Sequence, residues 1–313
     1  MLIEEVLELA KRHGATDCEV TWVNRSGVDT TVRLGKVEKL EFHNDALISI
    51  TVYKGKRKAS VSSTNSNAAA LPQLVATACA MAEHTEMDKY AGLPDRSELA
   101  TTSHDLCLDY PYSLDADYAI KIAQECEAAA LEFDPKINNS EGATISTLAS
   151  TRSYGNSAGF LGSVASTRYY LSCTALAECK GEKQRDADYS LTRNFTKLAT
   201  AQQIGANAAK KTLARLGART IKTGKVSVIF AAEVASSLLS SFLAAISGSN
   251  LYRKTSFLLD AVDQKIFADF INIKEQPHKL SGIGSSWFDA EGVATRSKDI
   301  VTAGVLNTYL LNS

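Results

Sequence analysis

A glycine-flanked serine is the first group whose type and spacing suit catalysis. Residues 155–159 read Gly-Asn-Ser-Ala-Gly and match G-x-S-x-G, the sharp strand-to-helix turn that exposes the nucleophile of many serine hydrolases. The following residues, 160–173, are rich in aromatic and β-branched types, which favour a hairpin. We therefore expect a hairpin turn that leaves Ser157 without the geometry that activates a nucleophile.

Two carboxylate pairs have the spacing of an acid–base couple. Asp186 with Asp188, and Asp289 with Glu291, are two residues apart, so on a strand each pair shares one face. Such a pair can exchange protons with a substrate, or it can form salt bridges or simply solvate a loop. The sequence leaves these alternatives open.

Ligands for a metal ion are spread too widely to predict a site. The histidines at 13, 43, 84, 104 and 278 form no H-E-x-x-H pair, and the cysteines at 18, 79, 107, 126, 173 and 179 form no C-x-x-C motif. We expect buried thiols and no metal or other cofactor in this chain.

Phosphate and nucleic-acid sites are also weakly indicated. Residues 282–286, Gly-Ile-Gly-Ser-Ser, lack the lysine of a phosphate-binding loop, and the basic run 54–58 lies at a proposed hairpin tip without aromatic residues for base stacking. Lys and Arg number 34 against 35 Asp and Glu, a net charge of −1. These features predict no direct nucleic-acid partner.

Targeting signals are not indicated either. The N-terminus carries acids where a signal peptide has bases, and serines interrupt the most apolar window, 231–250. The sequence predicts a cytoplasmic protein without a membrane partner.

The elements that must position these residues alternate between helical and strand patterns. Apolar residues at helical spacing predict a helix near 1–13, and residues 18–62 predict an antiparallel meander of about four strands. Turn signals lie at Asn44-Asp45 and Lys54-Gly55. An alanine-rich helix is expected at 67–83, before an irregular linker at 89–112.

A second set of elements repeats this style after the linker. We expect a helix at 113–132, strands at 136–149 and 162–177, and a helix at 200–217 that begins with a capping box. A short strand at 225–230 then leads into an apolar helix, and the remainder is expected to be β-rich, with strand patterns around 271–273, 282–288 and 304–306.

The predicted fold class is α+β, with antiparallel sheets and flanking helices. We divide the chain into an N-terminal α+β region, 1–220, and the start of a β-rich C-terminal domain, 221–313. The first region is expected to contain subunits at about 1–90 and 113–220.

The helix that follows residue 230 has no charged side chain between Glu233 and Arg253. Its apolar stripe lies opposite a serine-rich face and predicts burial; the stripe residues are Val234, Leu238, Leu239, Phe242, Leu243 and Ile246.

Four ordered motifs carry a resemblance to a known family. They are EKQRDADYSLTRNFTKL from 182, IGANAAKKTLARLGARTIKTGKVSVIF from 204, the 231–256 helix ending GSNLYRKTS, and GIGSSWFDAEGVATR from 282 with GVLNTYLLNS. Together they resemble the TldD/PmbA family over almost the whole chain. Asn156, Gly159, Arg253 and Ser256 lie at positions that match its motifs. Family chains continue beyond the position of Ser313, so we expect the C-terminal β-rich domain to be truncated.

The resemblance also implies where a metal site is missing. In the TldD branch the matching helix carries an H-E-x-x-x-H element, in which the histidines bind zinc and the glutamate is the general base. Aligning the helix ends places Leu239 and Ala244 at the histidine positions and Ser240 at the glutamate position. None can perform these roles, and no cysteine follows Cys179 to supply a further ligand. The chain therefore resembles the PmbA branch, also called TldE.

The resemblance implies a metal-free subunit of a heteromeric metallopeptidase, whose TldD-like partner would hold the zinc. Such an assembly would act on unfolded or short peptides, and this chain would have a structural, substrate-guiding role. An extended peptide would add as a strand near Gly284, Ser285, Asp289, Glu291 and Gly292. Two alternatives remain open: a self-sufficient hydrolase that uses Asp289 and Glu291 or Ser157, and a non-enzymatic homodimer that binds peptides.

Overall fold

The computed structural model describes residues 2–312, which form two compact units. The first contains residues up to Arg219 together with Leu280–Ala294, and the second contains Thr220–Lys279 and the residues from Thr295 onward. The junction of the two units lies between Arg219 and Thr220. The segment Leu280–Ala294, however, folds with the first unit.

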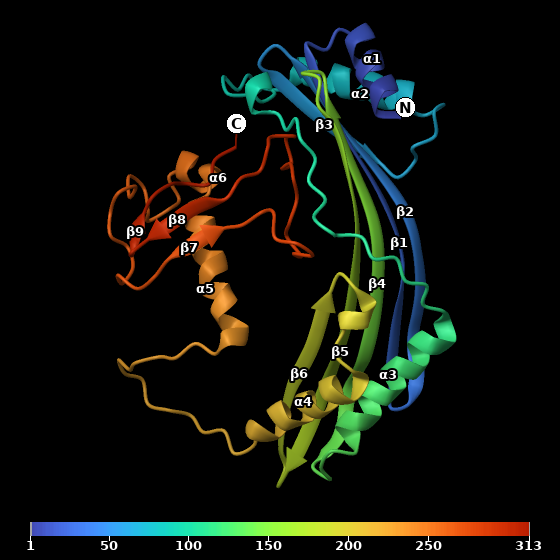
Figure 1. Cartoon of the computed structure of the whole chain (residues 1–313), viewed down its shortest axis with the longest axis vertical. Coiled ribbons are helices and arrows are strands. Elements are labelled where there is room, and N and C mark those ends of the chain that lie inside the picture. Colours follow the sequence, from blue (N-terminus) through green and yellow to red (C-terminus); the bar gives the residue numbers. More distant parts are fainter. Residues whose placement is uncertain (1, 313) are drawn as a thin grey trace. The chain divides into compact units, whose positions relative to one another are not determined.

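One antiparallel sheet with the strand order β3-β2-β1-β4-β5-β6 organises the first unit (Figure 1). Its strands are β1 (Asp17–Arg33), β2 (Lys36–Lys54), β3 (Arg57–Ser63), β4 (Ile137–Asn156), β5 (Leu161–Cys179) and β6 (Glu182–Thr192). Since β1 pairs with β4, the two expected subunits share a single sheet.

The two halves of this sheet repeat one arrangement of elements. The first half is α1 (Leu2–Arg12), three strands and α2 (Leu71–His84), and the second is α3 (Ala116–Leu131), three strands and α4 (Ala201–Ala214). The two helix pairs lie at opposite ends of the long strands (Figure 1). Short 3-10 turns occur at Arg96–Glu98 and Phe195–Lys197.

The first half contains three strands, so the expected four-stranded meander was wrong. Asn44 and Asp45 lie inside β2, and the chain turns instead at Leu34 and Gly35, which both have positive φ values of 49° and 74°. Glu127 explains this choice, because its carboxylate accepts the N–H groups of Leu34 at 2.8 Å and Gly35 at 2.9 Å. A distant side chain therefore stabilises a turn that a local pattern does not favour.

Both helix pairs cover the same face of the sheet, which we call the covered face. Alternate residues of each strand point into two apolar clusters, one under α1 and α2 with Val20 and Ile50, and one under α3 and α4 with Ile145 and Leu171. These side chains are almost completely buried. Neither of these helix pairs covers the opposite side of the sheet, which we call the open face.

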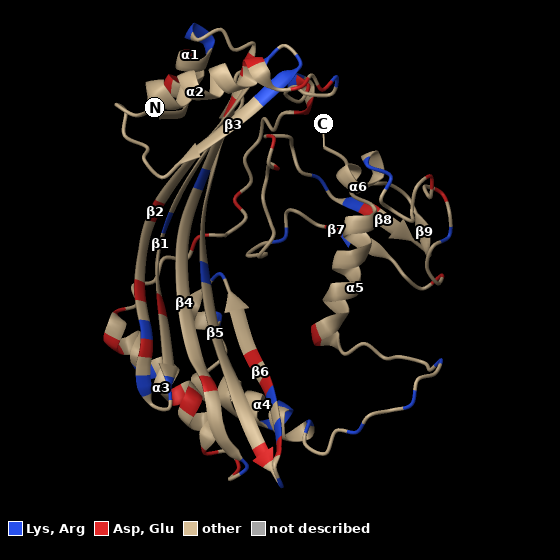
Figure 2. Cartoon of the chain, turned by 180° about the vertical axis from the view of Figure 1, so that it is seen from behind, with Lys and Arg blue, Asp and Glu red and all other residues tan. Residues whose placement is uncertain are grey.

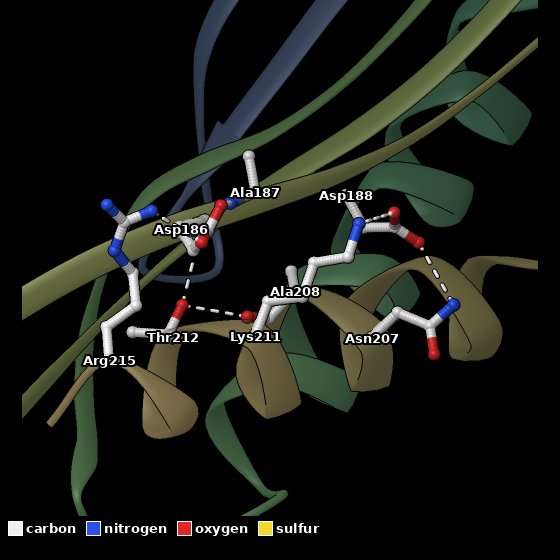
Figure 3. Close-up of polar contacts among 8 residues, drawn as sticks. All are labelled: Asp186, Ala187, Asp188, Asn207, Ala208, Lys211, Thr212 and Arg215. Carbon is white, nitrogen blue, oxygen red and sulfur yellow. Dashed lines mark hydrogen bonds and ion pairs between the residues drawn. The ribbon is translucent and has the colours of Figure 1, made fainter. Parts of the chain in front are cut away.

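Helix α4 is fixed to β6 by polar contacts at the margin of the covered face (Figure 3). Lys211 Nζ lies 2.7 Å from Asp188 Oδ1, and Arg215 Nη1 lies 2.8 Å from Asp186 Oδ2. The helix begins with the predicted capping box of Thr200 and Gln203. Asp186 and Asp188 do share one face of a strand, and they form salt bridges there.

The second unit contains a small three-stranded antiparallel sheet and two helices. Its elements are α5 (Ala232–Ala245), α6 (Gly248–Tyr252), β7 (Ile273–Glu275), β8 (Lys298–Thr302) and β9 (Val305–Leu306). The expected strands at 225–230 and 282–286 do not form: these residues have no regular secondary structure. Phe288 forms only an isolated bridge with Ala294. Strands need partners, and none pairs with either segment among residues 2–312.

Helix α5 is buried only at its C-terminal end. Phe242 is 7% exposed and Ile246 is 0% exposed, whereas Val234 and Leu238 are 53% and 49% exposed. The apolar stripe is therefore buried in its second half and exposed in its first half. The serines of the opposite face are satisfied within the helix, since Ser240 Oγ donates to Ser236 O at 3.0 Å and Ser241 Oγ to Ser237 O. No described helix has the length and apolar character to cross a bilayer.

Candidate functional site

Ser157 is a structural residue in the turn between β4 and β5. Its Oγ donates to Asp17 Oδ1 at 3.0 Å and accepts the N–H of Cys18 at 3.1 Å. The turn closes through Asn156, whose Oδ1 accepts the Phe160 N–H, and through Gly159 at φ 104°. The predicted hairpin is therefore confirmed, and the hydroxyl of Ser157 joins two strands.

Residues 280–294 lie on the open face of the sheet, next to this turn. Phe288 and Trp287 pack against Phe160, with ring centroids 5.0 and 5.8 Å apart. Backbone bonds hold the far end of the segment, since Ala100 N donates to Gly292 O and Ala294 N to Glu98 O, both at 3.0 Å. The segment is thus anchored by aromatic packing and by pairing to the linker.

Gly292 is required by this packing. Its φ is 83°, and a Cβ at this position would lie 2.7 Å from Cδ1 of Phe160. Any larger residue would displace the aromatic ring or strain the backbone. Gly284, by contrast, is exposed and has open space around the position of a Cβ.

A cavity of about 350 Å³ lies between this segment and the open face, and we call it the arginine pocket. Arg25 of β1, Arg152 of β4 and Arg193, just after β6, line it together with Ser285 and Asp289. The strand register explains the meeting, because Arg25 pairs with Ser150, and Ser150 and Arg152 point to the same side. The pocket therefore concentrates three cations against one carboxylate.

Arg193 is the most buried of the three, at 7% exposure. Its guanidinium donates to the backbone carbonyls of Thr167, Gly282 and Ile283, at 3.2, 3.4 and 2.6 Å. Nε has no hydrogen-bond partner within residues 2–312. Burial lowers the pKa of Arg193, and the nearby charge of Arg168 lowers it further. A buried cation that contacts only neutral carbonyls is incompletely compensated.

Arg152 is held in a fixed orientation beside the pocket. Its Nη2 donates to the backbone carbonyl of Asp289 at 2.9 Å, and its guanidinium carbon lies 4.6 Å from the ring centroid of Phe288. Burial lowers the pKa of Arg152, although the charge of Asp289 opposes that shift. The charged group is therefore positioned before any ligand arrives.

The carboxylate of Asp289 is already engaged by its own turn. Its Oδ1 accepts the N–H of Glu291 at 2.8 Å and the N–H of Val293 at 3.0 Å. Arg25 is exposed and, like Arg168 farther along the same face, makes no hydrogen bond or ion pair with the described residues. The positive charge of the pocket thus exceeds its negative charge.

The structure brings only some of the predicted peptide-binding residues to this pocket. Ser285, which is 8% exposed, and Asp289 line it, while Gly284, Glu291 and Gly292 do not. The sequence motifs did not indicate the three arginines. Strand alternation alone places Arg152 on the face of β4 that points away from its apolar residues. The pairing of β1 with β4, which brings Arg25 beside Arg152, cannot be read from the local pattern.

The family-motif residues of the second unit have local roles. Ser256 Oγ donates to Ala245 O at 2.6 Å and accepts the Leu258 N–H at 3.0 Å, which fixes the end of the helical region. Arg253 Nε donates to Ser249 O at 3.1 Å. On α5, Leu239 is 42% exposed and lies with Ser240 and Ala244, and no side chain of this set is a zinc ligand.

One group of described residues has donor atoms close enough to share a metal ion: Asp29, Glu41 and His43, on β1 and β2. His43 Nε2 and Asp29 Oδ2 are 2.8 Å apart and bond directly, while Lys39 Nζ lies 2.9 Å from Glu41 Oε2. Burial tends to raise the pKa of Asp29, but hydrogen bonds with Ser146 and His43 and the nearby charges of His43 and Lys39 hold it below its usual value. These contacts satisfy the group without an ion, so we assign no metal to it.

Comparisons with known proteins agree with this architecture. Three family models match: PmbA/TldA metallopeptidase domain 1 at residues 18–82, the central domain at 109–216 and the C-terminal domain at 223–313. The Haemophilus influenzae protein named metalloprotease PmbA homolog is 39% identical over 307 residues, which are 98% of this chain and 68% of the relative. Escherichia coli O157:H7 metalloprotease PmbA is 39% identical over 312 residues, covering 99% and 69%.

Solved structures share the fold. A Bacteroides thetaiotaomicron protein described as a candidate modulator of DNA gyrase superposes with a TM-score of 0.94 at 26% identity, covering 99% of this chain and 71% of that chain. TldE from Thermococcus kodakarensis gives a TM-score of 0.82 at 17% identity, covering 100% and 70%.

These matches define an α+β protein of antiparallel sheets and flanking helices, as the sequence predicted. The chain belongs to the PmbA/TldD family.

Proposed function

We propose that this chain is a metal-free, PmbA/TldE-like subunit of a heteromeric metallopeptidase that acts on unfolded or short peptides in the cytoplasm. One observation carries the proposal: the α5 positions matched to the zinc motif of the TldD branch hold Leu239, Ser240 and Ala244. Hydrocarbon cannot ligate zinc, and a serine hydroxyl cannot take a proton from bound water as a carboxylate does.

The role of the chain in this proposal is to position peptide while a zinc-bearing, TldD-like partner performs hydrolysis. The arginine pocket supports this role, because it is a cavity with oriented polar groups on a rigid sheet. Ser157 supports no independent hydrolase activity, since its hydroxyl is bonded to Asp17 and the Cys18 N–H. Residues of this chain therefore bind and orient in our account, and no catalytic step is assigned to them.

The test is to purify the chain alone and together with a zinc-bearing homologue from the same genome. We expect the isolated chain to contain less than about one tenth of a zinc ion per molecule, because we assign no zinc site to it. We also expect it to leave an unfolded peptide substrate intact. We expect the mixture to co-elute and to cleave that substrate. Stoichiometric zinc in the isolated chain, or turnover by it, would overturn the proposal in favour of a self-sufficient hydrolase.

A homodimer without any hydrolytic partner is the remaining outcome. Mass measurement in solution separates it from the heteromer, because a homodimer would leave the homologue in its own peak. Replacing Asp289 and Glu291 by Ala adds a control for hidden acid–base chemistry. We expect this double variant to leave kcat of the mixture within about twofold, since neither residue is assigned a proton-transfer role. A change is expected in KM instead, because Asp289 lines the arginine pocket.

A further inference from the structure

The open face carries an electrostatic imbalance that stability alone does not explain. Arg193 is buried without a carboxylate partner in residues 2–312, and its Nε–H is unsatisfied. Arg152 and Arg25 line the same cavity. Asp289 is the acidic residue in its lining, and its Oδ1 already accepts hydrogen bonds from two backbone N–H groups. Buried cations are normally paired, because desolvation of an unpaired charge is costly. The missing partner is therefore an anion.

The size and position of the cavity limit what that anion can be. A volume of about 350 Å³ lies at the lower end of small-ligand sites and suits one or two amino-acid residues. Acidic and basic residues are interspersed along the strands (Figure 2), and the net charge is −1, which does not favour a polyanion. A single small anionic group fits these limits better than nucleic acid.

We propose that the arginine pocket binds a carboxylate of the peptide substrate, through Arg25 and Arg152 beside the buried charge of Arg193. The proposal rests on the peptide-guiding role proposed above and specifies its substrate class. Guanidinium groups bind carboxylates with two parallel N–H donors, which gives geometric selectivity as well as attraction. Ser285, a residue with a hydroxyl group, also lines the cavity.

The bound carboxylate has two possible chemical sources: the C-terminus of the peptide, or an Asp or Glu side chain. Isothermal titration with three N-acetylated pentapeptides distinguishes them. One has a free C-terminus and no acidic side chain, the second is its C-terminal amide, and the third is an amide with one central Glu. Inorganic phosphate is the fourth probe.

We expect the free acid or the Glu amide to bind at least about tenfold more tightly than the neutral amide, the gain of one charge-assisted hydrogen-bond pair. The preferred peptide then identifies the source. Arg25→Gln is expected to remove about that factor for the acidic peptide only. Arg25 makes no bond to the described residues, so this variant should fold normally.

The matched control is Arg185→Gln, which removes an exposed arginine of β6 that is paired with Glu141 outside the pocket. We expect this control to bind all three peptides like the parent. Arg152→Lys is the second pocket variant: it keeps the charge but loses the bidentate fork, and we expect an intermediate loss.

Each other outcome counts against the assignment. Equal affinity of the neutral amide and both acidic peptides, or an Arg25→Gln affinity for the preferred acidic peptide equal to the parent's, would overturn the carboxylate proposal and leave the peptide-guiding role intact. Tight binding of phosphate with no peptide binding would overturn both the peptide assignment of the pocket and the guiding role. The zinc and co-elution measurements remain independent of all these results.

Discussion

The covered and open faces of the six-stranded sheet are built from alternate residues of the same strands, yet they differ in kind. The covered face contributes Val20, Ile145 and Leu171 to apolar clusters under two helix pairs. The open face presents Arg25 and Arg152 and is covered in part by residues 280–294. Neighbouring residues on one strand thus serve different purposes.

This difference indicates that the covered face stabilises the fold, whereas the open face is used for binding. Burial of apolar area accounts for the two clusters of the covered face. On the open face, an unpaired buried arginine reduces stability rather than increasing it. Features that cost stability and converge on a cavity are typical of binding sites. The comparison can be tested by changing one face at a time.

The largest effect is expected from truncation of the covered core. Leu171→Ala removes a side chain that is 1% exposed, so it should lower the free energy of unfolding of the first unit by about 2 to 5 kcal/mol. Urea titration followed by tryptophan fluorescence measures this, because Trp22 and Trp287 both lie in the first unit. The matched control is Leu148→Ala on the open face, with an expected loss of about 1 kcal/mol or less. Equal losses would contradict the comparison.

The next effect concerns the buried carboxylate that holds the β1–β2 turn. Glu127 is 1% exposed and accepts hydrogen bonds from Leu34 N, Gly35 N and Ser140 Oγ. Glu127→Ala leaves these donors without an acceptor, so we expect the free energy of unfolding to fall by about 2 to 4 kcal/mol in the same urea titration. Glu125→Ala, on the same helix but less buried, should lose under about 1 kcal/mol. If Glu127→Ala were as mild as its neighbour, the turn would not depend on this contact.

A smaller effect is expected from the polar link between α4 and β6. Burial tends to raise the pKa of Asp186, but the hydrogen bonds from Arg215 and from Ala187 N, together with the charges of Arg215 and Lys211, outweigh it, so the pKa is lowered from 3.8. A lowered native pKa stabilises the fold above the unfolded value, and this stability is lost as the pH falls through the native value. Arg215 is 57% exposed, so solvent screening limits the contribution to about 0.5 kcal/mol.

Urea titrations of Arg215→Gln and the parent at pH 7 and pH 2.5 measure this link. We expect the difference in unfolding free energy to be present at pH 7 and smaller at pH 2.5. Lys11→Gln, on α1 and away from this ion pair, controls for the general effect of removing a cation. A difference that persists unchanged in acid would show that Arg215 acts through packing.

The smallest effect on stability is expected for the variant that should weaken peptide binding most. Arg25→Gln on the open face should change the free energy of unfolding by less than about 0.5 kcal/mol, because Arg25 is exposed and makes no bond to the described residues. The Leu171 and Arg25 variants thus form opposite ends of the comparison. A large loss of stability in Arg25→Gln would mean that the open face also supports the fold.

Local patterns in the sequence predicted the elements that depend on local chemistry. The capping box of Thr200 and Gln203, the hairpin at 155–159 and the shared face of Asp186 and Asp188 were all predicted correctly. Each involves residues only a few positions apart. The α+β class followed from the alternation of helical and strand patterns together with the family resemblance.

Elements that depend on distant residues were not predictable in this way. The turn at Leu34-Gly35 depends on Glu127, and the strand pattern at 225–230 finds no partner among the described residues. The arginine pocket needs the register of β1 against β4 and the return of residues 280–294 to the first unit. Its arginines are far apart in the sequence, and their individual spacing carries no signal.

Methyl chemical shifts during a peptide titration test the central claim most directly, because they report both faces in one experiment. Val23 and Val164 line the arginine pocket, and Ile145 and Leu171 lie in the covered core. With a saturating acidic pentapeptide, the account predicts that the methyl signals of Val23 and Val164 shift while those of Ile145 and Leu171 do not. Shifts confined to the covered core, or no shift of either valine on saturation, would contradict it.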